Sequence, residues 1–93
     1  MHFFTNLKET VEKAEQIVSI GGLYTHYRNA DHQYKVLAIA INEKTEEPCV
    51  VYQALYGEKL IWIRSLSVWC DSIEYEGKNV LRFIKITSQV IVD

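Results

Sequence analysis

The sequence contains few of the residues from which disulfide frameworks, metal centres and membrane spans are built. Its two cysteines, Cys49 and Cys70, are too few for a disulfide framework and lack metal-ligand spacing, so we expect reduced, largely structural thiols. The longest apolar run, residues 36–41, is too short to span a membrane, and the N-terminus lacks the features of a signal peptide. We therefore expect a cytoplasmic protein with no membrane partner.

The chain also lacks an excess of positive charge. Its 93 residues carry a formal net charge of -2, and no cluster of lysine and arginine is present. Nucleic acid would require such a cluster, so we do not expect it as a partner. Glycine-rich phosphate loops, zinc-ligand pairs and serine-centred nucleophile motifs are missing as well. His26, Asp31 and His32 lie close in sequence, but no third histidine or cysteine stands at fixed spacing from them, so we expect no metal and no cofactor.

One amphipathic helix is predicted before the glycine pair at positions 21–22. Apolar residues recur at helical spacing between about residues 6 and 19. Asn6 suits an N-cap, and Glu9 and Lys13 are spaced for an i,i+4 ion pair. The apolar stripe must pack on the rest of the chain or on another copy, because a helix of this length is marginal alone. The stripe consists of Leu7, Val11, Ala14 and Ile17.

After the glycine pair the pattern indicates five β-strands. They are rich in β-branched and aromatic residues, and polar segments that include "NADH" and "SVWCDS" separate them. Short antiparallel strands in so few residues favour a small, partly closed barrel, because an open sheet would expose two edges. The strands read "LYTHYR", "QYKVLAIAI", "PCVVYQALY", "LIWIRSL" and "NVLRFIKI". The expected core residues are Val36, Ala38, Val50, Tyr52, Ile61, Ile63 and Phe83.

Several short motifs occur in a recognisable order along these strands. They are "GLYTHYR" from Gly22, "YKVL" from Tyr34, "VVY" and "LYG" from Val50 to Gly57, "WIR" from Trp62, and "RF" at Arg82. Together they resemble the domain-of-unknown-function family numbered 1653, whose bacterial members are short proteins. Two departures are "RNADHQ" in place of a short basic-glycine turn, and Ser65 in place of a proline.

The resemblance implies a small, mostly β fold of the SH3-like kind and implies no activity. We therefore expect one domain over residues 1–93, mostly β with one N-terminal helix. The helix, residues 1–20, should pack on or beside a five-stranded antiparallel SH3-like barrel formed by residues 21–93, the part that resembles the family.

The segment "KLIWIRSL" carries the clearest candidate site. Its two-residue period places Trp62 and Arg64 on one face and Ile61 and Ile63 on the other. We expect the isoleucines to face the core. Trp62 and Arg64 would then share the outer or groove face, where an indole and a guanidinium can hold a carboxylate, a phosphate or a planar group. Alternatively, these aromatic residues only cover an open end of the barrel.

The sequence therefore predicts a non-catalytic binding module whose groove holds a peptide or a small anionic or planar ligand. A first alternative is a small enzyme or enzyme accessory in which His26 exchanges a proton and Arg64 holds an anion. A second alternative is a structural or assembly protein whose N-terminal helix pairs across a homodimer. The candidate ligand-binding residues are His26, Tyr27, Tyr56, Trp62 and Arg64, and none is assigned a catalytic role.

Overall fold

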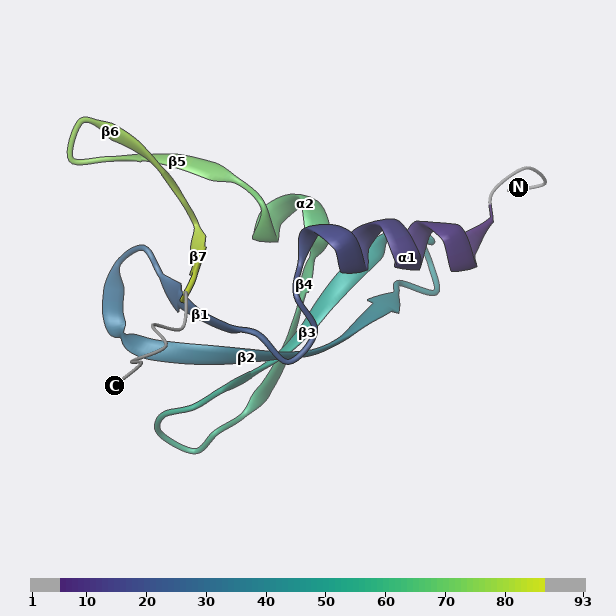
Figure 1. Ribbon diagram of the computed structural model, residues 1–93, viewed down its shortest axis with the longest axis horizontal. Helices are drawn as coiled ribbons and strands as arrows, with labels where there is room; N and C mark the ends of the chain where they lie inside the picture. The colour runs from purple at the N-terminus through teal and green to yellow at the C-terminus, as the bar shows by residue number, and fades with distance from the viewer. Residues whose placement is uncertain (1–5, 87–93) are drawn as a thin grey trace, which may run out of the picture.

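The computed structural model describes residues 6–86, which form two helices and seven strands (Figure 1). The elements are α1 (Leu7–Ile17), β1 (Leu23–His26), β2 (Asn29–Ile41), β3 (Pro48–Ala54), β4 (Ile61–Ser65), α2 (Leu66–Trp69), β5 (Ser72–Tyr75), β6 (Lys78–Leu81) and β7 (Phe83–Lys85). The protein is thus mostly β with an N-terminal helix, as the sequence predicts. Neither helix is long and apolar enough to cross a membrane, within the residues described.

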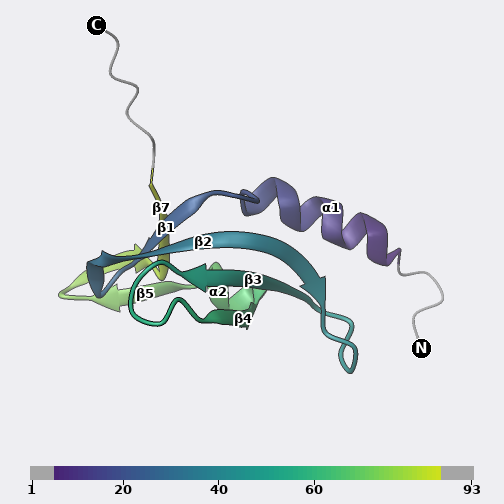
Figure 2. The ribbon, with the colours of Figure 1, turned by 90° about the horizontal axis from the view of Figure 1, so that it is seen from below.

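The strands form two antiparallel sheets instead of one barrel. The larger sheet has the order β4-β3-β2-β1-β7, and β5 pairs only with β6. The long strand β2 arches across the molecule between β1 and β3 (Figure 2). Because β4 and β7 lie at opposite edges of an open sheet, the predicted five-stranded SH3-like barrel is not confirmed.

The structure has more strands than the five predicted, because the segment after α2 forms a separate hairpin. Glu76 and Gly77 both have positive φ, 52° and 80°, which suits the tight turn of a two-residue hairpin. This turn pairs β5 with β6, and the hairpin extends away from α1 (Figure 1). The predicted last strand is therefore divided at Arg82 into β6 and β7.

Two segments predicted as loops belong to regular elements. The "NADH" segment forms the start of β2, because His26 pairs directly with Asn29 and leaves only Tyr27 and Arg28 in the turn. The "SVWCDS" segment starts within α2, whose N-cap Ser65 accepts a hydrogen bond from the Val68 N–H at 3.3 Å. Both elements depend on short-range contacts that periodicity does not reveal.

The start of α1 is stabilised as predicted. The Asn6 side chain accepts a hydrogen bond from the Glu9 N–H at 3.1 Å, and Glu9 pairs with Lys13 at 3.7 Å. Of the predicted stripe, Leu7, Val11 and Ala14 are buried or half-buried, but the last buried position is the C-cap Val18 instead of Ile17. Val18 is 1% exposed and joins the core, whereas Ile17 is 63% exposed, so the prediction that Ile17 is covered is wrong.

The core lies on one face of the larger sheet, here called the core face. Trp69 of α2 stacks on Phe83 with ring centroids 3.8 Å apart, and it makes T-shaped ring contacts with Tyr24 and Tyr52. α2 therefore closes this face with Trp69, which the sequence predicts to lie in a loop. The buried cluster consists of Val18, Tyr24, Val36, Val50, Tyr52, Trp69 and Phe83.

The opposite face of the sheet, here called the outer face, carries the isoleucines of β4. Ile61 and Ile63 are 60% and 61% exposed, so their assignment to the core is wrong. Trp62 lies opposite the buried Tyr52, which puts the isoleucines on the outer face. Ala38, another predicted core residue, is also exposed, because a bulge after Val36 turns it to the outer face.

Candidate ligand-binding site

A cavity of about 190 Å³ lies on the core face beside the edge strand β4. The antiparallel register of β2, β3 and β4 brings its lining residues together from three strands and the turn after β3. They are Tyr34, Tyr52, Tyr56, Trp62 and Arg64. Three residues that the sequence analysis selected, Tyr56, Trp62 and Arg64, thus share one cavity.

The tyrosines form a connected wall. The hydroxyl oxygens of Tyr34 and Tyr56 are 2.8 Å apart, within hydrogen-bond distance. The Tyr34 ring makes edge contacts with Tyr52 and Tyr56, and His32 stacks on Tyr56 with centroids 3.8 Å apart. Burial and the hydrogen bond to Tyr56 raise the pKa of Tyr34 well above its usual value. At neutral pH Tyr34 is therefore a neutral phenol that can donate or accept a hydrogen bond.

Arg64 supplies the positive charge of the cavity. Its guanidinium lies over the Phe83 ring, with Cζ 5.4 Å from the ring centroid, and its side chain is half-buried. Within residues 6–86 it makes neither an ion pair nor a hydrogen bond. A half-buried guanidinium with free donors is suited to a planar anion, which it can hold through two parallel hydrogen bonds.

His26 lies near the cavity without lining it. Its ring and the Phe83 ring form a T-shaped contact with centroids 5.3 Å apart, and the Arg64 guanidinium lies over the same Phe83 ring. Burial, and then the charges of Arg64, Arg82 and Arg28, lower the pKa of His26 below 6.5. The imidazole is therefore mainly neutral at pH 7. Its Nδ1 accepts the Arg28 backbone N–H at 3.3 Å, which places the proton on Nε2.

Tyr27 lies farther from the cavity than the sequence analysis expected. Its ring packs edge-on against Tyr75 of the β5–β6 hairpin, with centroids 5.2 Å apart. Its hydroxyl accepts a hydrogen bond from Arg28 Nε at 3.1 Å. These contacts occupy the ring and the hydroxyl, and Tyr27 is not among the residues that line the cavity.

Sequence reasoning missed Tyr34 as a lining residue and assigned Tyr52 to the core alone. Tyr52 is 5% exposed, so it serves the core and the cavity together. A signal for Tyr34 was present, because it is two positions before the buried Val36 and therefore shares its face of β2. The cross-strand register that brings Tyr34 near Tyr56 could not be read from either strand by itself.

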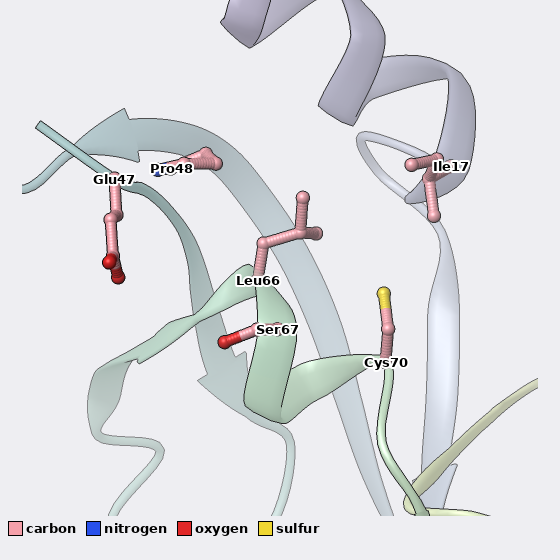
Figure 3. Close-up of a pocket in the computed structure, with 6 residues that line it drawn as sticks. All are labelled: Ile17, Glu47, Pro48, Leu66, Ser67 and Cys70. Atoms are coloured by element: carbon pink, nitrogen blue, oxygen red, sulfur yellow. The ribbon is translucent and has the colours of Figure 1, made fainter.

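A larger cavity of about 370 Å³ lies between the end of α1, the start of β3 and α2 (Figure 3). The Cys70 sulfur points into the space between Leu66 and Ile17. Burial, and then Asp71, raise the pKa of the Cys70 thiol, which disfavours the reactive thiolate. Cys70 and the buried Cys49 are both free. In residues 6–86, no group of three or more His, Cys, Asp or Glu side chains could hold a metal ion.

The fold and the cavity describe a small, mostly β protein with an aromatic, arginine-containing pocket. Residues 22–85 match the family described as "Protein of unknown function (DUF1653)", and the chain therefore belongs to this family. The crystal structure of a DUF1653 protein from Bordetella bronchiseptica is similar, with a TM-score of 0.62 and 27% identity, over 78% of this chain and 92% of that chain. No curated protein matches the chain. The resemblance predicted from the sequence motifs is thus confirmed, and neither description assigns an activity.

Proposed function

We propose that the protein is a non-catalytic binding module. Its cavity receives a carboxylate or a similar planar anionic group, presented by a peptide or by a small molecule. The observation that carries the proposal is Arg64, a half-buried guanidinium without an acidic partner among the described residues, placed in a wall of aromatic rings.

The electrostatics around Arg64 favour an anion. Arg64, Arg82 and Arg28 all lower the pKa of His26, so the potential around this neighbour of the cavity is positive. Asp71 pairs with Arg82 at 3.8 Å and is an exposed carboxylate. A negatively charged group beside Arg64 would therefore gain a charge-assisted contact in surroundings partly shielded from water.

The aromatic residues supply shape and polarity. Trp62 is 52% exposed although it lies on the core face, so its indole is available to a ligand. The paired hydroxyls of Tyr34 and Tyr56 add hydrogen-bonding groups on the opposite wall. Exposed tryptophan, tyrosine and arginine are the residue types that contribute most to binding energy at interfaces. Because these side chains already contact one another, binding would cost little further side-chain conformational entropy.

The first test uses two small probes of similar shape. Benzoate carries a planar carboxylate, whereas benzamide replaces it with a neutral amide. We expect benzoate to shift the NMR signals of Tyr34, Tyr56, Trp62 and Arg64, and benzamide to shift them weakly or not at all. Arg64→Lys should weaken benzoate binding about tenfold, because an ammonium cannot form the bidentate contact. Arg28→Lys is the matched control, since Arg28 does not line the cavity.

Trp62→Ala separates binding from packing. If the indole serves a ligand, the substitution should weaken benzoate binding and leave the free energy of unfolding within about 1 kcal/mol of the parent, because half of the side chain is already in water. Equal binding of benzamide and benzoate, or a Trp62→Ala variant that unfolds, would contradict the proposal. The two alternative functions stay predictions. They are a small enzyme that uses His26 and Arg64, and an assembly protein that pairs through α1.

A further inference from the structure

The size of the cavity restricts what can occupy it. Its volume of about 190 Å³ lies below the roughly 300–1,000 Å³ that is usual for small-molecule sites. It corresponds to about six water molecules, which is the scale of one amino-acid side chain. A free ion of this size can gain only modest affinity, because binding energy is limited by the number of ligand atoms. A ligand that binds with higher affinity must therefore extend beyond the cavity.

The edge strand β4 offers a continuation. The Ala54 N–H donates to the Leu60 carbonyl at 3.0 Å, and this bond fixes the phase of the β3–β4 ladder. Hydrogen-bonded pairs alternate in an antiparallel ladder, so Trp62 and Arg64 direct their backbone groups toward β3. The N–H and C=O groups of Ile61 and Ile63 consequently point away from β3. No strand of residues 6–86 pairs with that side of β4.

The side chains along this edge are also suited to pairing. Ile61 and Ile63 are largely exposed on the outer face, and Trp62 is half exposed on the core face. Edge strands are usually protected from pairing by proline, bulges or several charges. In β4 the only charged residue is Arg64, and it lines the cavity instead of protecting the edge.

We infer that an extended acidic peptide adds to β4 as a sixth, antiparallel strand, with one carboxylate side chain in the cavity. This inference rests on the proposed function and names its ligand class. Directly opposed residues of an antiparallel pair share a face, so a peptide residue opposite Trp62 or Arg64 places its side chain on the core face. For a peptide residue opposite Trp62, the two neighbouring peptide residues hydrogen-bond to Ile61 and Ile63. The guanidinium of Arg64, which lines the cavity and has no acidic partner among residues 6–86, selects an acidic side chain.

The test uses a short valine-rich peptide with one central glutamate. We expect it to bind at least about tenfold more tightly than free acetate or benzoate, because strand pairing adds several backbone hydrogen bonds. A matched peptide with glutamine at the centre should lose most of this affinity. The amide signals of Ile61 and Ile63 should shift only with the peptide, whereas those of Tyr56 and Arg64 should shift with either ligand.

Two methylated peptides test the backbone phase directly. The nitrogen of the glutamate should point away from β4, so methylating it should change the affinity less than about threefold. Methylating the nitrogens of both neighbours removes the hydrogen bonds to β4, and it should reduce the affinity at least about tenfold. Equal effects of the two peptides would overturn the inference.

The protein offers a matched pair at the same position. Ile63→Pro removes an N–H that points away from β3, so it should abolish the extra affinity of the peptide and preserve benzoate binding. Ile63→Thr keeps the N–H and should retain the peptide. If benzoate binds but the peptide binds no more tightly than benzoate, the inference is overturned and the proposed function is not. If neither ligand binds, both are overturned. A dimer in sedimentation that Ile63→Pro dissociates would also overturn the inference, since a second copy would then occupy β4.

Discussion

At the scale of the residue, the charges that favour an anion in the cavity also act on His26. Arg64 reaches it from β4, Arg82 from the junction of β6 and β7, and Arg28 from the turn after β1, while His32 of β2 adds a smaller contribution. Burial acts in the same direction and is the largest cause. The histidine is therefore held neutral in the folded protein at a pH where an unfolded chain would begin to protonate it.

This predicts a pH-dependent stability. Because the pKa of His26 is lowered below 6.5 on folding, the unfolded state binds more protons and stability rises with pH. The contribution of His26 is complete above pH 6.5 and is lost as the pH falls through the lowered pKa. Urea unfolding from about pH 8 to about pH 5 should show this decline, and His26→Gln should reduce it. An unchanged slope in the variant would assign the decline to other groups.

At the scale of the element, features set by residues close in sequence were predicted correctly, whereas the face that a strand turns to the core was not. The N-cap of α1 is a hydrogen bond between Asn6 and Glu9, which are close in sequence, and it was predicted correctly. The alternation in β4 correctly placed Trp62 and Arg64 together, but it could not decide which face they occupy. Hydrophobicity favours the isoleucines for the core, whereas the cross-strand pairing of Trp62 with the buried Tyr52 puts them on the other face, and this register cannot be read from β4 alone. Trp69 was missed because a four-residue helix shows no period.

The two adjacent residues at the end of α1 provide a test of its packing. Val18→Asp should destabilise the protein by about 3 kcal/mol or more, because it buries a charge without a partner. Ile17→Asp should change the free energy of unfolding by about 0.5 kcal/mol or less, because that side chain is exposed. Urea denaturation of both variants measures the difference. Similar losses for the two would mean that α1 packs through another face.

At the scale of the whole molecule, the missing closure of the barrel could not be predicted from the sequence. Closure requires two distant strands to pair, and no single segment records whether they do so. The tight turn at Glu76 and Gly77 was visible in the sequence, but its effect on the topology was not. The candidate cavity has the same origin, since Tyr34, Tyr56 and Trp62 meet only after three strands have taken their register.

This topology predicts regions of different stability. The β5–β6 hairpin pairs only with itself, whereas β2 is flanked by β1 and β3 at the centre of the larger sheet. Amides of the hairpin should therefore exchange with deuterium through local opening, and those between β2 and β3 only through global unfolding. Native-state exchange at low denaturant would show a lower opening free energy for Ile73 and Val80 than for Val51 and Gln53, whose N–H groups point from β3 toward β2. Equal values would indicate one cooperative unit.

The contrasting burial of the two tryptophans gives the protein two internal fluorophores. Trp69 is 3% exposed and stacked on Phe83, so its emission should lie at short wavelength and move to longer wavelength on unfolding. Trp62 is 52% exposed, so it should emit as an indole in water and be accessible to a quencher such as iodide. A ligand in the cavity would shield Trp62 and leave Trp69 unaffected. Folding and occupancy can thus be followed separately by emission wavelength and quenching, in one unlabelled sample.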